Sequence, residues 1–241
     1  MSMLLATGKI TVGHPPVSPV KLGPLTINPE IVWSSLLAAA IVLALGFAVR
    51  RKATKGVPGK LQLAYETIVE QIREVADSSI GTEGRRFVPL AITLFLFILI
   101  CNMFEILPNT GKNFLPTPTG DVNLPLAMAL LVIVWVHVES VKARGMRGYL
   151  HHYATPYKAM IPINIIDELT KPITLTFRLF GNIFSGSLMV VVMATLLPFY
   201  ASFVGQMLWK PFDLGIGVIQ AFIFALLTIL YFGMAMAKED H

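Results

Sequence analysis

One arginine, Arg178, lies inside a long stretch that is otherwise almost bare of charge, KPITLTFRLFGNIFSGSLMVVVMATLLP. Arginine keeps its charge at any physiological pH. Placing a charge at the centre of a bilayer costs roughly 2.5–3.5 kcal/mol on insertion scales, so such residues usually face a partner or a water-filled cavity. The position indicates a functional cation at membrane depth. The alternative is an arginine that only snorkels to the interface, and its place well inside the run argues against that.

Other polar side chains recur around this arginine at helical spacing. Asn182 and Ser185 follow Arg178 at i+4 and i+7, and in a later apolar segment Gln220 follows Asp213 at i+7. Residues at this spacing share one face of a helix. The simpler interpretations are an interfacial cap for Asp213 and a helix–helix hydrogen bond for Gln220.

More polar groups lie toward the two ends of these segments. The inner end holds Asn164, Asp167 and Glu168, and the outer end holds Ser187 together with Asp213. This arrangement predicts polar access from both sides of the membrane to one cation. Glu105 lies at the outer end of an earlier apolar segment and is either an interfacial carboxylate or a relay, and His137 is a weaker candidate.

The composition is that of an integral membrane protein. The chain is 55% hydrophobic and only 14% charged, with a mean hydropathy of +0.69, whereas an average soluble domain has about 25% charged residues. The net charge of +5 is spread over the loops between apolar segments, which argues against nucleic-acid binding. The sequence carries no metal-ligand or nucleotide-binding pattern, so no cofactor is expected.

Five apolar segments reach the ~20 residues that a helix needs to cross a bilayer. A more polar segment has an apolar stripe at helical spacing and predicts an amphipathic helix on the inner surface, packed either on the protein or on lipid. We therefore expect an all-α membrane protein that forms a single domain over residues 1–241. The expected parts are an outer N-terminal segment (1–30), spans at 31–49, 87–107 and 122–141, the amphipathic helix at 61–80, and helices at 164–198 and 210–238.

Basic residues predict the orientation. With the N-terminus outside, four of the 19 lysines and arginines fall in outer segments, namely Lys9, Lys21, Lys112 and Lys210. Arg178 belongs to neither side, and the other fourteen are inside. The positive-inside rule therefore places the N-terminus outside and the C-terminus in the cytoplasm.

The last two helices are too long for upright spans. Residues 164–198 would form about 50 Å of helix at 1.5 Å per residue, against ~30 Å of hydrocarbon. Tilt relieves such a mismatch, so we expect the two helices to be strongly tilted and to form a hairpin. Gly181, Gly186, Gly215 and Gly217 supply small side chains that allow close helix contacts.

Two segments carry a resemblance to a known family. FRLFGNIFSG (residues 177–186) and VIQAFIFALLTILY (residues 218–231) resemble the two signature segments of subunit a of F-type ATP synthases, and PINIIDELTKPITLTFRLFGN extends the first match upstream. The five-span plan and the inner amphipathic helix fit the same family. The resemblance covers nearly the whole chain.

The resemblance implies roles for individual residues. Arg178 matches the arginine that faces the ion-carrying carboxylate of the rotor c-ring, and Asn182 and Gln220 match polar residues around it. The stretch with Asn164, Asp167 and Glu168 matches the inner half-channel. At one position of this stretch, family members often carry a carboxylate, whereas this chain has Asn164. We therefore expect Glu168 to take over the role of that carboxylate.

The outer half-channel departs as well. Ser187 stands where other members often carry Glu or His, which leaves Asp213 as the ionisable group of that outer pair. The resemblance further implies partners, namely the c-ring, the peripheral-stalk b subunits and the lipid of a bacterial inner membrane, and no covalent chemistry on this chain. The alternatives are a stand-alone ion channel or secondary transporter, and a structural scaffold. The choice between H⁺ and Na⁺, and between Glu168 and Asp167, stays open.

Overall fold

The computed structural model describes residues 20–22, 25–54, 58–106, 116–154, 157 and 160–236. Most of the expected outer N-terminal segment therefore lies outside the described residues. The elements, in chain order, are β1 (Val20–Leu22), β2 (Leu25–Ile27), α1 (Pro29–Lys52), α2 (Lys60–Ile80), the 3₁₀ turn η1 (Gly81–Phe87), α3 (Val88–Met103), the short 3₁₀ turns η2 (Phe104–Ile106) and η3 (Pro118–Gly120), α4 (Asn123–Ala154), α5 (Ile161–Leu196) and α6 (Phe199–Met236).

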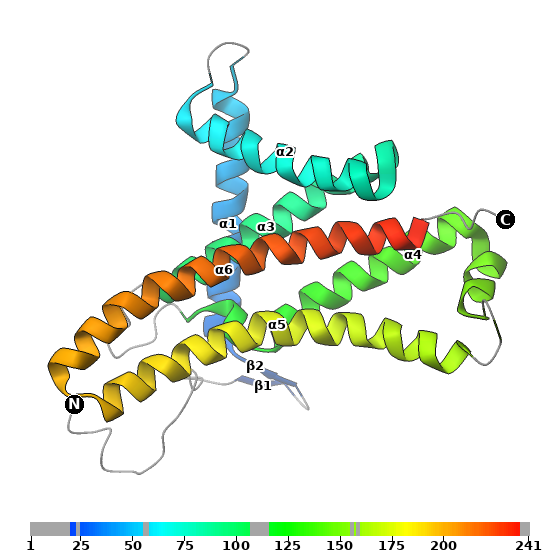
Figure 1. The fold of residues 1–241 in the computed structure, drawn as a ribbon. Coiled ribbons are helices and arrows are strands. Elements are labelled where there is room, and N and C mark those ends of the chain that lie inside the picture. The colour runs from blue at the N-terminus through cyan, green and yellow to red at the C-terminus, as the bar shows by residue number, and fades with distance from the viewer. Residues whose placement is uncertain are drawn as a thin grey trace.

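The expected fold class is confirmed. Five helical segments are long and apolar enough to cross a membrane: α1, residues 84–103, α4, α5 and α6. Before α1, the short strands β1 and β2 pair in antiparallel register, with Val20 opposite Ile27, an addition that the sequence did not suggest. In Figure 1, α1 stands upright while α5 and α6 run across it at a steep angle.

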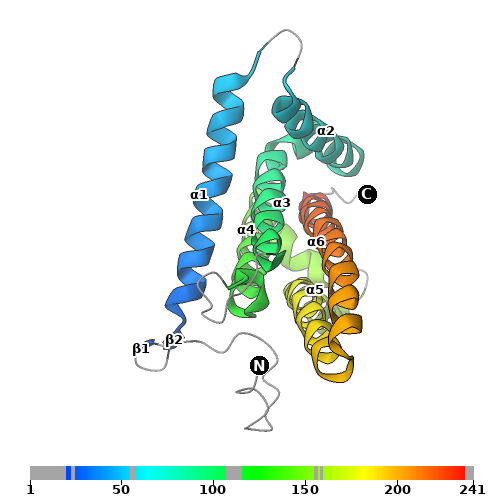
Figure 2. The same cartoon turned by 90° about the vertical axis from the view of Figure 1, so that its left-hand side faces the viewer.

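The helices form layers. Figure 2 shows α1 on one side, α3 and α4 in the middle, and the α5–α6 hairpin on the other side. One apolar cluster joins α2 through α6, where the rings of Phe87 and Phe232 stack at 3.8 Å between centroids. A second, smaller cluster joins α1 to α3. The middle layer therefore sets the position of the hairpin.

The amphipathic helix α2 packs on the protein. Its buried residues Ile72 and Ala76 join the same apolar cluster as Phe87 and Phe232. The sequence left open whether the apolar stripe of α2 contacts the protein or lipid. At Ile72 and Ala76 it contacts the protein.

The last helix begins earlier than the sequence suggested. We expected this helix over residues 210–238. In the structure α6 begins at Phe199 and continues through Pro211. Side-chain contacts support the extra turns, because Gln206 donates to the Ser202 hydroxyl at 3.0 Å. The result is a hairpin of two helices of 36 and 38 residues.

The third span also continues past its expected end. We expected residues 122–141, but α4 extends to Ala154 with a break at Gly145, where φ is +72°. This backbone region strongly favours glycine. The break turns the basic end of α4 away from the span, which brings Tyr149 back beside His137.

Candidate functional site

Arg178 lies on the exposed side of α5. Its side chain is exposed, and the neighbouring Phe177 is 62% exposed. Within the described part of the chain, no acidic residue forms an ion pair with Arg178. The guanidinium acts electrostatically on Tyr231 of α6, as does Glu168. A cation is thus presented on an apolar surface without a counter-ion from the residues that surround it in this chain.

The predicted polar face of α6 is buried. Asp213, Gly217, Gln220 and Phe224 all face the interior, and Gln220 is only 7% exposed. The Nε2 atom of Gln220 is buried and has no hydrogen-bond partner among the described residues. An unpaired buried amide costs about 1–3 kcal/mol, so this nitrogen is available to a group that approaches the site.

Two contacts fix the antiparallel register of the hairpin. Gly186 of α5 lies against Asp213 of α6, and Lys171 of α5 lies over the ring of Tyr231 of α6, with its Nζ 5.5 Å from the centroid. Interpolating between these contacts places Gln220 within about one turn of the level of Arg178. The structure therefore places Arg178 and Gln220 at about the same level of the hairpin, the first on its exposed side and the second in its interior.

The outer end of the hairpin carries a pair of carboxyl groups. Glu105, in η2, and Asp213, in α6, lie within side-chain hydrogen-bonding reach of each other, and Lys210 is close enough to act on Glu105. Two carboxyl groups this close share a proton more readily than they carry two negative charges. The sequence left open whether Glu105 is an interfacial carboxylate or a relay. The structure places it in the same cluster as Asp213.

The other predicted outer residues lie nearby on α5. Asn182 and Ser187 are both half-buried, and the Asn182 backbone carbonyl accepts a hydrogen bond from the Ser185 hydroxyl at 2.9 Å. Gly186 lies between them in the sequence and is buried. A Cβ at Gly186 would lie 2.8 Å from the Cγ of Asp213, so a larger residue there would displace the carboxyl group.

Sequence reasoning missed a buried polar network beside this pair. Asn102 of α3 is 4% exposed, and its Nδ2 donates to the backbone carbonyl of Gly217 at 3.1 Å. Its Oδ1 accepts a hydrogen bond from the Thr119 hydroxyl at 3.0 Å. The available signal was an asparagine next to Glu105 within an apolar run, in CNMFEILP. This network holds α6 against α3 next to the level of Asp213.

The inner end of the hairpin carries an ionic cluster. Glu168 pairs with Lys171 at 2.7 Å, and its other oxygen lies 3.7 Å from Nε2 of His137 on α4. Asn164 is half-buried one turn before Glu168, whereas Asp167 is exposed. The sequence named Glu168 and Asp167 together, and it missed Lys171. Glu168 is the one of the two carboxylates that faces α4.

A separate acidic residue on α4 is committed to other partners. Glu139 is 8% exposed and pairs with Lys142 at 2.9 Å and with Arg86 at 3.2 Å. These contacts join the inner ends of α3 and α4. Glu139 is therefore engaged in structural ion pairs and is not part of the cluster around Glu168.

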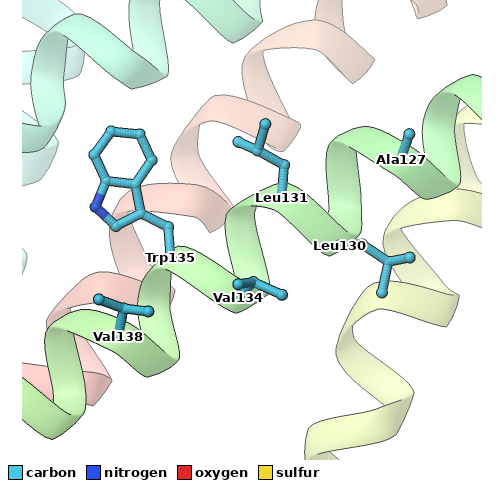
Figure 3. Close-up of a pocket in the computed structure, with 6 residues that line it drawn as sticks. All are labelled: Ala127, Leu130, Leu131, Val134, Trp135 and Val138. Carbon is cyan, nitrogen blue, oxygen red and sulfur yellow. The ribbon is translucent and has the colours of Figure 1, made fainter.

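Outside these clusters, the described residues show no metal site and one apolar hollow. The described residues contain no group of three or more His, Cys, Asp or Glu side chains that could hold a metal ion. A shallow hollow on one face of α4 is lined by apolar residues and one tryptophan (Figure 3), namely Ala127, Leu130, Leu131, Val134, Trp135 and Val138. Without an ionisable group, this hollow carries no site.

The fold and the site define a multi-pass membrane protein whose polar residues follow a helical hairpin. Comparison with known proteins agrees: the family described as "ATP synthase A chain" matches residues 31–233. The chain belongs to this family.

Individual relatives are similar over most of their length. The chain is 49% identical to ATP synthase subunit a of Acidothermus cellulolyticus over 218 residues, which are 90% of this chain and 80% of that protein. It is 43% identical to ATP synthase subunit a of Mycobacterium tuberculosis over 226 residues, 90% of each chain. Over 236 residues it is 34% identical to the Vibrio vulnificus protein of the same description, with 89% of this chain and 86% of that protein covered.

Proposed function

We propose that this chain is the proton-translocating stator subunit a of an F-type ATP synthase. It forms two offset half-channels against the rotor c-ring and couples proton flow to ring rotation and ATP synthesis. The observation that carries the proposal is the exposed Arg178, which has no acidic partner in the described part of its own chain while acidic clusters lie toward both ends of its hairpin. Such a cation fits a counter-charge supplied by another subunit.

The outer half-channel is built on the carboxyl pair Asp213 and Glu105. Asn182, Ser187 and Gln220 extend this polar path along α5 and α6 toward the level of Arg178. A proton that arrives from outside is held by the carboxyl pair and passed to a rotor carboxylate. Ser187 contributes a hydrogen-bonding wall, since it cannot carry charge.

The inner half-channel is built on Glu168. On α5, Asn164 lies one turn before Glu168 and Asp167 directly precedes it. Both line the path from the cytoplasm to Glu168. The paired Lys171 holds the Glu168 carboxylate in place. A proton released by the rotor at this level leaves toward the inner side.

The spacing along α5 keeps the two half-channels apart. From Glu168 to Arg178 the helix rises ~15 Å, and from Arg178 to Gly186, beside Asp213, it rises ~12 Å. Proton transfer needs donor and acceptor within ~3 Å or one intervening water. A proton therefore cannot pass directly between the two clusters, and the cation between them raises the electrostatic barrier further.

The rotor completes the path. A protonated carboxylic acid can face lipid, whereas a carboxylate there is penalised by several kcal/mol. A rotor acid therefore moves away from Arg178 only after it has been protonated from the outer side. Near Arg178 the guanidinium stabilises the deprotonated form, because an opposite charge within ~4–6 Å favours it. Driving force comes from the membrane potential, ~2.3 kcal/mol per charge per 100 mV, and from any pH gradient.

The proposal includes the surroundings of the chain. One copy assembles with the c-ring and with peripheral-stalk b subunits in a bacterial plasma membrane, with its N-terminus outside and its C-terminus in the cytoplasm. Nucleotide chemistry takes place on other subunits. All 241 residues then form one membrane domain.

Site-specific photo-crosslinking in native membranes tests this proposal. The only cysteine of the chain, Cys101, is buried, so a cysteine placed at the exposed Phe177 can be labelled selectively with a photoactivatable maleimide. We expect Phe177→Cys to crosslink to a small helical-hairpin subunit that bears a membrane-centre Asp or Glu. Leu43→Cys is the matched control, because Leu43 is 74% exposed on α1, on the opposite side of the bundle (Figure 2). Failure of Phe177→Cys to capture such a subunit, or equal capture from Leu43→Cys, would contradict the proposal.

A further inference from the structure

His137 connects the inner acidic cluster to a tyrosine near the inner surface. Its Nε2 lies 3.7 Å from Oε1 of Glu168, and its Nδ1 lies 3.5 Å from the hydroxyl of Tyr149. The imidazole is partly exposed, with 31% of its side-chain surface accessible. Both ring nitrogens therefore face a group that can exchange a proton, one on α5 and one beyond the Gly145 break in α4.

The carboxylate at this level is already engaged. Oε2 of Glu168 accepts a hydrogen bond from Lys171 at 2.7 Å, and its Oε1 faces the imidazole. On the other side, the ammonium of Lys171 lies over the ring of Tyr231. Among the side chains that the structure describes, Glu168 of α5 and Tyr149 of the same helix face His137. Lys171 lies behind Glu168, and Tyr231 of α6 lies behind Lys171. Histidine is the side-chain type that most often serves as a proton shuttle in proteins.

We propose that His137 is a proton relay of the inner half-channel, between Glu168 and the water at the inner end of α4. This inference rests on the proposed function, which supplies a proton at the level of Glu168. The sequence alone gave His137 little weight, because nothing in the chain order places residue 137 beside residue 168.

The transfer conserves the proton. The transfer uses the neutral tautomer in which Nδ1 carries the hydrogen, beside the Tyr149 oxygen. Nε2 accepts the proton that arrives by way of Glu168, and the ring is briefly an imidazolium. The proton on Nδ1 then leaves to water beside Tyr149, and exchange of the two ring tautomers through water restores the starting state. Distances of 3.5–3.7 Å at rest are typical of transfer groups that tighten only when the proton is passed.

The test measures ATP-driven proton pumping by the complete ATP synthase in inside-out vesicles, where the inner side faces the assay medium. His137→Gln keeps hydrogen-bonding groups but cannot carry a proton as imidazolium. We expect pumping to fall roughly tenfold or more, within the range in which positioned acid–base groups act. The pH dependence between pH 5.5 and 8, about the range in which imidazole titrates, should flatten, and imidazole added to the medium should restore part of the rate.

Tyr149→Phe provides the second variant. It leaves His137 in place and removes the hydroxyl 3.5 Å from Nδ1, so pumping should fall several-fold. Assembly is checked by the yield of intact complex. Wild-type rates and an unchanged pH profile in both variants would overturn the relay, as would a slow His137→Gln variant that imidazole does not rescue. If His137→Gln fails to assemble, a wild-type rate in Tyr149→Phe overturns it.

Arg178→Ala distinguishes failure of the relay from failure of the proposed function. If the relay is wrong but the proposed function is right, both inner variants pump normally and Arg178→Ala does not pump. If the proposed function itself is wrong, Arg178→Ala pumps normally. Each result therefore identifies which of the two statements fails.

Discussion

The carboxyl group of Asp213 in α6 lies against the bare Cα of Gly186 in α5, so that an added Cβ would meet Cγ and Oδ1 at 2.8 Å. The two helices of the hairpin are therefore in contact at the outer acidic group. This contact fixes the place of Asp213 relative to α5, and so relative to the side of the protein on which Arg178 is exposed.

The first prediction is that Gly186→Ala impairs proton transport by displacing this carboxyl group. A shift of about 1 Å in a transfer site can cost about 100-fold, and we expect at least a tenfold loss of ATP-driven pumping in reconstituted complex. Gly46→Ala in α1 is the matched control, because a Cβ there meets nothing within 4 Å. Equal activity of the two variants would show that the close contact has no role.

The second prediction concerns the carboxyl pair at the outer end. Asp213→Asn and Glu105→Gln each remove one of two neighbouring carboxyl groups that are proposed to hold the arriving proton. Residues in one network are not additive, so the double variant should pump no more slowly than the worse single variant. Losses that multiply, measured in the same vesicles, would mean that the two carboxyl groups work separately.

The third prediction concerns stability. Asn102→Ala removes the amide that donates to Gly217 and accepts from Thr119, and it leaves a buried hydroxyl without its partner. Unpaired buried groups cost about 1–3 kcal/mol, and thermal dissociation of the complex should occur at a lower temperature. Thr93→Ala is the control, because the Thr93 hydroxyl is exposed and bonds only within its own helix. An unchanged dissociation temperature for Asn102→Ala would argue against the network.

The fourth prediction is a pH dependence outside the membrane. The hydrogen bond from Arg85 lowers the pKa of Asp77, in α2, below its ordinary value of 3.8. In the folded chain Asp77 therefore binds a proton less readily than in the unfolded one. The stabilisation from this ion pair is fully present above the ordinary pKa and is lost as pH falls through the lowered one.

Hydrogen exchange measures this effect at the junction of α2 and η1. The amide of Gly81 bonds to the carbonyl of Asp77, so Asp77→Asn should speed exchange there at neutral pH. The difference between the variant and the wild type should vanish at pH values well below 3.8. A difference that persists at low pH, or that is absent at neutral pH, would contradict this assignment.

The sequence predicted what depends on apolar length and on charge pattern. Long runs without charge gave the five spans, and the excess length of the last two gave the tilted hairpin. That Asp213 and Gln220 share one face of α6 followed from helical spacing, because neighbours on one face of a helix are fixed by its pitch. The burial of that face did not follow from the sequence.

Contacts between distant segments were beyond the sequence. His137 lies beside Glu168, and Glu105 beside Asp213, only because of the way α3 and α4 pack under the hairpin. The break at Gly145 is likewise a property of one backbone position. The start of α6 at Phe199 was also missed, because the expected helix began at residue 210.

The account depends most on Arg178 and on its lack of an acidic partner among the described residues. The most direct measurement is ATP synthesis driven by an imposed proton gradient, in vesicles that hold the complete complex with Arg178→Ala. We expect assembled complex, intact ATP hydrolysis by the catalytic subunits and no synthesis above background. ATP synthesis at the wild-type rate in that variant would contradict the account.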